Sequence, residues 1–325
     1  MIAITGGAGF IGSAVAWQLN QAGRTDLLIV DELQSSDKWR NLANLRFAEF
    51  VPKDEFLAQV AANRLPTLDA IVHMGAISST TETDVDLLLR NNYEYTKTLA
   101  RYCAANGVRL VYASSAATYG DGTQGYSDED AATQSLLPLN PYGYSKQLFD
   151  LWAHREGLLS TIVGLKFFNV FGPNEYHKGD MTSVVYQAFN QIRERGSVRL
   201  FKSDDARYPD GGQQRDFIYV KDAVRVIQWF LDHRDANGLF NLGTGRARTF
   251  RDLAVATFSA MGVPEIIEYI PMPAPLQGKY QYFTQADDAK LRRAGCDIQF
   301  GTLEDTVADY VRGHLAQAQP YLRSR

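Results

Sequence analysis

A glycine-rich turn near the start of the chain constrains the fold more than any other feature of the sequence. Gly6, Gly9 and Gly12 follow a short apolar run at residues 2–5 and precede a helical pattern at residues 14–22. Glycines allow the backbone to approach a bound group closely, and the first amides of the following helix attract phosphate. The pattern predicts a strand–turn–helix unit that binds the pyrophosphate of a dinucleotide.

An acidic residue follows at the position where such a unit contacts the adenosine ribose. Asp31 closes the next apolar run, residues 27–30, about 20 residues after the turn. A carboxylate there favours NAD, whereas Lys38, Arg40 and Lys53 offer cations for the 2′-phosphate of NADP. The residues alone therefore leave NAD and NADP both open.

Apolar runs alternate with helical patterns through the first half of the chain. Strands are predicted at residues 2–5, 27–30, 70–73, 110–113 and 162–168, and helices at residues 14–22, 56–62, 91–105 and 144–155. This alternation is typical of a parallel sheet covered by helices on both faces, so we expect an α/β fold with a doubly wound Rossmann sheet.

Beyond about residue 169 the pattern changes, and loops rich in glycine, proline and charge interrupt it. Residues 217–233 predict a strand and a helix that return to the core, and residues 241–245 predict a turn. Thr249 is a suitable N-cap for a helix that runs to Met261.

This change of pattern predicts two interleaved domains with approximate boundaries. Residues 1–168 and 217–245 would form an NAD(P)-binding Rossmann domain. Residues 169–216 and 246–325 would form a smaller α/β substrate domain.

The composition excludes several classes of protein. The chain has 325 residues, 33 Lys and Arg against 37 Asp and Glu, and 45% hydrophobic residues, which is ordinary for a globular protein. This mild acidity argues against a nucleic-acid partner. No signal-peptide pattern is present, and no apolar run reaches the ~20 residues that cross a bilayer, so no membrane partner is expected. Cys103 and Cys296 are isolated and the five histidines lack ligand spacing, so we expect no metal site and a reducing, cytoplasmic location.

A tyrosine and a lysine are spaced to share one face of a predicted helix. Tyr142 and Lys146 form a Tyr-x-x-x-Lys pattern, in which the ammonium is expected to lower the pKa of the phenol from its reference value of ~10. Such a phenol can act as a general base. Ser115 follows the strand at residues 110–113, at the sheet edge where ligands bind, and is expected to hydrogen-bond a substrate hydroxyl or ketone.

These motifs resemble, in order, those of extended short-chain dehydrogenases/reductases that act on nucleotide sugars. The resemblance includes residues 6–12, 112–120 and 142–146 and continues through residues 169–173, 215–222 and 240–243. Residues 78–82, 177–179 and 278–287 are similar to those of the family members that epimerise an ADP-linked heptose at C6. That resemblance implies bound NADP, a homo-oligomer that the family suggests is a pentamer, and a part in lipopolysaccharide core precursor synthesis.

The resemblance also implies a role for individual residues. Tyr142 and Lys178 match two catalytic acid/bases, Ser115 the serine beside the reacting carbon, and Lys146 the lysine that holds the cofactor. The implied cofactor-binding residues are Gly6, Gly9, Phe10, Ile11, Gly12, Asp31, Glu32, Lys38, Lys53, Met74, Gly75, Ala76, Ile77, Ser78, Asn91, Lys146, Val170 and Lys178. The implied substrate-binding residues are Ser79, Asn169, Asp180, Gln187, Phe201, Lys202, Ser203, Asp204, Arg215 and Tyr280.

The sequence departs from the family pattern at four places. Glu32 replaces an expected asparagine, Met74 an expected acid and Gln187 an expected histidine, and residues 208–214 look like an insertion before Arg215.

The implied reaction converts ADP-D-glycero-β-D-manno-heptose into its L-glycero epimer by transient oxidation at C6. Two alternatives stay open. One is another nucleotide-sugar enzyme such as a UDP-hexose 4-epimerase, and the other is a dinucleotide sensor without catalytic activity. A dehydratase is disfavoured, because Ala116 and Ala117 stand where its acidic pair is expected.

Overall fold

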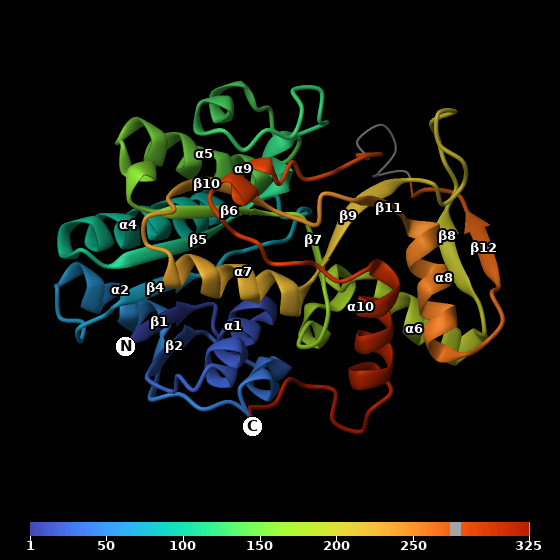
Figure 1. The fold of residues 1–325 in the computed structure, drawn as a ribbon, viewed down its shortest axis with the longest axis horizontal. Coiled ribbons are helices and arrows are strands. Elements are labelled where there is room, and N and C mark those ends of the chain that lie inside the picture. Colours follow the sequence, from blue (N-terminus) through green and yellow to red (C-terminus); the bar gives the residue numbers. More distant parts are fainter. Residues whose placement is uncertain (274–280, 325) are drawn as a thin grey trace.

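A seven-stranded sheet, in which all neighbouring strands are parallel, dominates the computed structural model, which describes residues 1–273 and 281–324 (Figure 1). The strand order is β10-β6-β5-β4-β1-β2-β3. These strands are β1 (Ile2–Thr5), β2 (Leu27–Asp31), β3 (Glu49–Pro52), β4 (Ala70–His73), β5 (Arg109–Ser115), β6 (Val163–Phe167) and β10 (Gly238–Leu242).

The sheet has two buried faces, each covered by helices. Ile2 and Ile4 of β1 belong to one apolar core, whereas Ala3 between them belongs to the other. The first core includes side chains of α1 (Phe10–Gln21) and α7 (Val220–Asp232), and the second those of α2 (Lys53–Ala61), α4 (Tyr95–Asn106) and α5 (Pro141–Arg155). This arrangement confirms the predicted doubly wound α/β sheet, because successive strand residues point to opposite faces.

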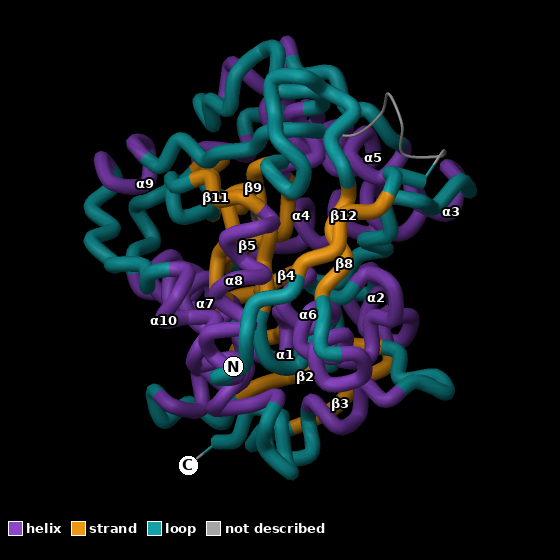
Figure 2. Tube along the Cα trace, turned by 90° about the vertical axis from the view of Figure 1, so that its right-hand side faces the viewer, coloured by secondary structure: helices purple, strands orange, loops and turns teal. Residues whose placement is uncertain are grey.

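A smaller group of elements lies at the right of this sheet in Figure 1 and faces the viewer in Figure 2. It contains the strand pair β8 (Val198–Phe201) and β12 (Ile267–Ile270) with the helices α6 (Val184–Arg195) and α8 (Phe250–Met261). Thr249 caps α8 through a capping box with Asp252, as the sequence predicts.

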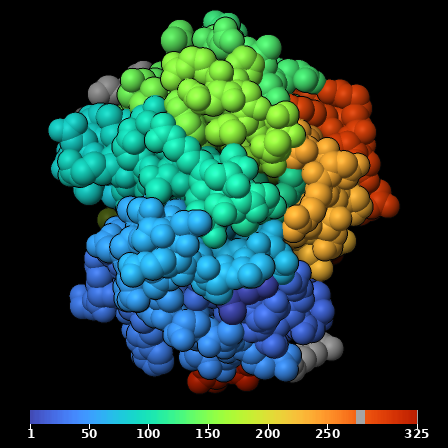
Figure 3. All heavy atoms as spheres, turned by 90° about the vertical axis from the view of Figure 1, so that its left-hand side faces the viewer, coloured from blue at the N-terminus to red at the C-terminus, as the bar shows by residue number. Residues whose placement is uncertain are grey.

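Between the two groups lies a three-stranded sheet of β11 (Ala247–Thr249), β9 (Gln214–Tyr219) and β7 (Asn169–Phe171). The remaining short helices are α3 (Val85–Leu88), α9 (Ala289–Arg293) and α10 (Leu303–Tyr310). Figure 3 shows the opposite end of the molecule, where the first half of the chain, blue to green, forms most of the surface. The division into two interleaved domains stays a prediction.

Several local predictions differ from the structure: β3 was not predicted, and α2 and α5 each begin three residues before the predicted start. The predicted turn at residues 241–245 is partly strand, because β10 pairs with β6 through Leu242. The predicted helix at residues 91–105 is preceded by α3 and starts as a π-helical stretch, Leu89–Glu94. Helix α1 begins at Phe10, directly after the glycine turn, rather than at residue 14. Within the described residues, no helix is long and apolar enough to cross a membrane.

Candidate active site

The glycine turn brings three backbone segments so close together that side chains would not fit. Gly6 has φ +64°, and a Cβ on it would lie 2.6 Å from Cα of Gly75 at the end of β4. A Cβ on Gly12 would lie 2.1 Å from the carbonyl oxygen of Gly6. Gly9 is the N-cap of α1 and has no side chain to cap its first amides. These features fit the pyrophosphate of a dinucleotide, which needs close backbone approach and free helix amides.

A pocket of about 210 Å³ extends from this turn toward the ends of β2 and β4. Its lining brings together the predicted cofactor residues Gly6, Asp31, Glu32, Lys38, Lys53, Gly75, Ala76, Ile77 and Asn91. Phe10, Ile11 and Gly12 lie next to it, in the first turn of α1. Met74 is not among the residues that line the pocket, and its backbone amide donates to the carbonyl of Thr5 at 3.0 Å.

The two acids of this pocket are each paired with a lysine. Asp31 accepts hydrogen bonds from the Lys38 ammonium at 2.7 Å and from the Ala8 amide at 2.9 Å. Glu32 lies 3.3 Å from the Lys53 ammonium. Each negative charge is therefore balanced at the predicted ribose position.

Asn92 is a site residue that the sequence reasoning missed. Its side chain accepts from the Ile77 amide and donates to the Ile77 carbonyl, both at 2.9 Å, and donates to Ser145 Oγ at 3.1 Å. It thereby connects the cofactor loop to the helix that carries Tyr142 and Lys146. The detectable signal was the Asn91–Asn92 pair in a helical segment, which the structure shows as π-helix, a form frequent at functional sites.

The predicted catalytic residues of α5 and β5 meet as expected. Asn140 caps α5 and Pro141 occupies its first turn, which fixes where the helix begins. The side chain of Tyr142 lies near that of Ser115, which acts to lower the pKa of the phenol. Lys146 is buried and donates to the Ala113 carbonyl at 2.9 Å.

One electrostatic prediction was wrong. The sequence predicted that Lys146 lowers the pKa of Tyr142, but burial raises the pKa of this tyrosine, and only the Ser115 side chain acts in the opposite direction. Burial also lowers the pKa of Lys146 to about 8, against the attraction of Asp150. The cause is common to both groups, since loss of water disfavours the phenolate and the ammonium alike.

Lys178 lies beside the dinucleotide turn although it is far away in sequence. Its ammonium is 5.2 Å from the centre of the Phe10 ring. Burial lowers the pKa of Lys178, and the nearby carboxylate of Glu175 acts in the opposite direction. A lysine with a lowered pKa exchanges protons more readily near neutral pH, as an acid/base requires.

Hydrogen bonds from residues that were not predicted from the sequence connect the loop that carries Lys178 to α1 and the glycine turn. Asn174 donates to Ser13 Oγ at 2.9 Å and accepts from the Leu322 amide at 3.0 Å. Asn41 donates to the carbonyl of Asn174 at 3.1 Å and to that of Ala8 at 2.9 Å. Two buried amides thus fix the loop against the glycine turn.

The predicted substrate residues lie on several separate segments. Arg215 of β9 is buried, and its guanidinium lies 5.7 Å from the centre of the Phe250 ring. Asn169 and Asp180 are exposed, Ser79 is half-buried, and Gln187 donates to the Thr182 carbonyl at 3.0 Å. Of the predicted cofactor residues outside the pocket, Val170 is half-buried and Ser78 is exposed. Tyr280 lies outside the described residues.

The insertion at residues 208–214 folds back onto the predicted substrate segment at residues 201–204. Asp210 accepts from the Ser203 amide at 2.8 Å, and the Gly211 amide donates to the Phe201 carbonyl at 3.1 Å. Gln213 donates to the Lys202 carbonyl at 3.3 Å, and the Asp204 amide donates to the Tyr282 hydroxyl at 3.0 Å. The insertion therefore shapes the backbone of that segment.

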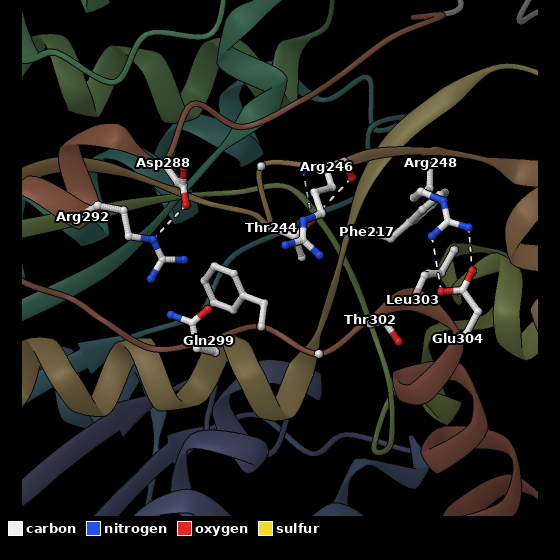
Figure 4. Close-up of a pocket in the computed structure, with 13 residues that line it drawn as sticks. Phe217, Thr244, Arg246, Arg248, Asp288, Arg292, Gln299, Thr302, Leu303 and Glu304 are labelled. Atoms are coloured by element: carbon white, nitrogen blue, oxygen red, sulfur yellow. Dashed lines mark hydrogen bonds and ion pairs between the residues drawn. The ribbon is translucent and has the colours of Figure 1, made fainter.

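A larger pocket, about 390 Å³, lies elsewhere, between α9, α10 and the turn before β11 (Figure 4). Two of its arginines form ion pairs: Arg248 pairs with Glu304 at 2.6 Å, and Arg292 pairs with Asp288 at 2.9 Å. None of the predicted catalytic, cofactor or substrate residues lines it. The smaller pocket is the candidate cofactor site, because predicted cofactor residues line it, whereas Tyr142, Ser115 and Lys178 do not.

Comparisons with known proteins agree with this geometry. The model of the NAD dependent epimerase/dehydratase family matches residues 2–243. A relative from Nitratidesulfovibrio vulgaris named ADP-L-glycero-D-manno-heptose-6-epimerase is 56% identical over 323 residues, which covers 99% of this chain and 100% of the relative. One of the same name from Fusobacterium nucleatum is 47% identical over 334 residues and covers 99% of this chain and 100% of the relative.

Solved structures of nucleotide-sugar epimerases share the fold of this chain. The crystal structure of Helicobacter pylori ADP-L-glycero-D-manno-heptose-6-epimerase has a TM-score of 0.80 and 25% identity, and covers 97% of this chain and 96% of that chain. A Thermus thermophilus UDP-glucose 4-epimerase in complex with NAD has a TM-score of 0.73 and 25% identity, and covers 96% and 99%. The chain belongs to the NAD dependent epimerase/dehydratase family and, by its full-length relatives, to the group named ADP-L-glycero-D-manno-heptose-6-epimerase.

Proposed function

We propose that this chain epimerises ADP-D-glycero-β-D-manno-heptose at C6 with bound NADP, as a step that supplies lipopolysaccharide core precursors. The observation that carries the proposal is the placement of two acid/base groups on different elements at the carboxyl edge of one parallel sheet. Tyr142 lies near Ser115 at the end of β5, and the Lys178 ammonium lies 5.2 Å from the centre of the Phe10 ring at the start of α1, which follows β1. The names of the full-length relatives support the substrate.

Inversion at C6 requires that a carbon–hydrogen bond without an acidic proton be broken and re-formed. Removal and return of a hydride is the chemistry that a nicotinamide supplies when bound. Tyr142 takes the proton of the C6 hydroxyl as the carbon is oxidised, and Ser115 hydrogen-bonds the same oxygen. Lys146, four residues after Tyr142 on α5, would hold the cofactor ribose through its ammonium.

Two acid/bases follow from the geometry of the sugar. Because C6 lies outside the ring, rotation about its bond to the ring presents the opposite face of the ketone and moves the oxygen. Tyr142 serves one position of that oxygen and Lys178 the other, each on its own rigid support. The substrate is oxidised and then reduced, so the cycle has no net redox change.

The cofactor assignment rests on the paired charges at the ribose end of the pocket. Lys38 and Lys53 already neutralise Asp31 and Glu32, so the acids do not present an unbalanced negative charge to a 2′-phosphate. Both lysines retain protons that can be donated to such a phosphate. This favours NADP over NAD.

Three further properties belong to the same proposal. The chain acts as a homo-oligomer, as the resemblance to its family implies. It works in the cytoplasm, in agreement with two buried, free cysteines. Its two interleaved domains divide near residues 168, 216 and 245. Support for this division is that β10, which comes after residue 216, lies in the same sheet as β1–β6.

The test is a direct assay with identification of the bound dinucleotide. Purified protein is incubated with ADP-D-glycero-β-D-manno-heptose and, separately, with UDP-glucose, and the products are resolved by NMR. The dinucleotide released on denaturation is identified by mass. Epimerisation of the heptose at C6 with released NADP is expected. Conversion of UDP-glucose alone would assign the chain to the 4-epimerases, and inactivity with a retained dinucleotide would favour the sensor alternative.

A further inference from the structure

A fully buried ion pair lies beneath the catalytic residues. The Lys166 ammonium of β6 is 2.8 Å from Oδ2 of Asp150 in α5, and both side chains have 0% exposure. Desolvation of two such charges offsets much or all of their attraction, and apolar residues of equal size are often as stabilising. Stability alone therefore does not explain why a lysine occupies this buried position in β6.

The Asp150 carboxylate connects α5 to β5 through two hydrogen bonds. Its Oδ1 accepts a hydrogen bond from the Tyr112 hydroxyl at 2.8 Å, and its Oδ2 accepts from Ser114 Oγ at 2.6 Å. Ser114 directly precedes Ser115, whose side chain lies near that of Tyr142. The carboxylate is thus fully hydrogen-bonded, as a buried charge requires.

Lys166 extends the same network to the far side of Ser115. Its ammonium donates to Thr118 Oγ1 at 2.9 Å, and the Thr118 hydroxyl donates to the Ser115 carbonyl at 2.8 Å. Ser115 Oγ in turn accepts from the Ala117 amide at 3.1 Å. The backbone of Ser115 is therefore held from both sides by groups that the ion pair organises.

Asp150 also follows Lys146 by one turn of α5, so the two side chains share a helix face. Burial and Asp150 are the two influences on the pKa of Lys146: burial lowers it, Asp150 raises it, and the result is about 8. His73 of β4 is near enough to be affected by Lys146, but its own pKa of about 3 leaves it neutral. The other titratable groups on elements packed against α5 are Asp86, Arg90, Tyr93, Glu94, Arg109, Tyr112, Tyr119 and Asp130.

We propose that Asp150 is a positioning residue of the epimerisation, which, held by Lys166, fixes the strand end that carries Ser115 and places a negative charge one helical turn after Lys146. The proposal rests on the proposed function in one respect, because the role of the Lys146 ammonium in catalysis requires that the chain is an epimerase. The effect of the Asp150 charge on Lys146 does not depend on that function.

The test removes the pair as a unit, so that neither charge is left buried without a partner. The variant Asp150→Asn/Lys166→Met is compared with Tyr112→Phe, which removes one hydrogen bond to Asp150 and leaves both charges. The pKa of Lys146 is measured by NMR on isotope-labelled lysine side chains, with its resonance assigned from Lys146→Arg. The pH dependence of kcat/KM is recorded in parallel.

We expect the pKa of Lys146 to fall by roughly one unit in the double variant and to stay unchanged in Tyr112→Phe. The alkaline limb of kcat/KM shifts by the same amount, so activity at pH 9 falls about tenfold more than activity at pH 6.5. A purely structural role would lower activity equally at all pH values.

An unchanged pKa of Lys146 in the folded double variant would overturn the proposal. If that variant does not fold, Asp150→Asn alone is measured in the same way, and failure of both to fold would assign the pair to stability only. The lysine titration needs no sugar. A wild-type protein that does not epimerise ADP-heptose would therefore refute the proposed function without deciding the pKa result.

Discussion

The carboxylate of Asp31 is shared between the Lys38 ammonium at 2.7 Å and the Ala8 amide at 2.9 Å. One end of this acid thus holds the glycine turn, and the other is neutralised by a lysine from the loop after β2. An acid at this position usually signals NAD, because it accepts from the ribose hydroxyls. Here Asp31 pairs with Lys38, one of the two lysines that line the same pocket.

Replacement of Lys38 or Lys53 by alanine is expected to weaken binding of NADP more than binding of NAD. A charge-assisted hydrogen bond contributes about 1.5–3 kcal/mol, so each change raises the Kd for NADP about tenfold or more. Fluorescence titration of dinucleotide-free protein with both cofactors measures the ratio. Arg40→Ala is the matched control, since Arg40 pairs with Asp37 at 3.2 Å. Equal losses for the two cofactors would contradict the NADP assignment.

Tyr142→Phe and Lys178→Met are each expected to lower kcat by about 10²–10⁴-fold with the dinucleotide retained. Each change removes one proton-transfer group and leaves the glycine turn intact. Single-turnover assays with both epimers measure the effect. Tyr144→Phe, an exposed tyrosine on the same helix, and Lys221→Met, which pairs with Asp309, serve as controls. Normal epimerisation by the Tyr142→Phe/Lys178→Met double variant would rule out the two-base assignment.

The rate is expected to fall as the pH rises through about 8. Burial lowers the pKa of Lys146 to about 8, so the ammonium is present below that pH and lost above it. His73 contributes no limb near neutrality, because burial lowers its pKa to about 3. A profile of kcat/KM from pH 6 to 10 checks this. In Lys146→Arg the limb moves to higher pH, because a guanidinium keeps its proton. An unmoved limb would assign it to another group.

Gly12→Ala is expected to destabilise the protein by roughly 1–3 kcal/mol or more and to abolish loading with dinucleotide. Its Cβ would lie 2.1 Å from the Gly6 carbonyl oxygen, which has no room to move. Gly9→Ala is the graded comparison, because its Cβ would be 3.1 Å from the same oxygen. Urea unfolding and the dinucleotide content after purification report the two effects. Wild-type loading of Gly12→Ala would show that the helix does not need this close approach.

The sequence allowed correct prediction of features whose cause is local. Residues 2–12 contain a strand, a turn and a helix start in an order that only a βα unit satisfies, and Thr249 carries its own capping box. The alternation of apolar runs sufficed to predict a parallel sheet, because strands buried on both faces have no polar side. Tyr142 and Lys146 could be found because i and i+4 share a helix face.

What the sequence could not supply depends on contacts between distant segments. Asn174 is hydrogen-bonded to Ser13, and the Lys178 ammonium lies beside the Phe10 ring. Asn92, in the π-helical stretch, is hydrogen-bonded to Ile77. A long-range hydrogen bond leaves no periodic pattern in the chain, so such partners emerge only once the strands are ordered.

The sequence by itself determined the fold class and the dinucleotide turn, and it predicted two acid/base residues: Tyr142 from its helix spacing with Lys146, and Lys178 from the resemblance to the family. Only the tertiary structure decided their electrostatics. It raises the pKa of Tyr142 and lowers that of Lys146 through burial, and it places the Asp150–Lys166 pair beneath both. The physical reason is that a pKa depends on the water and charge that surround a group in space, and neither is a property of its neighbours in sequence.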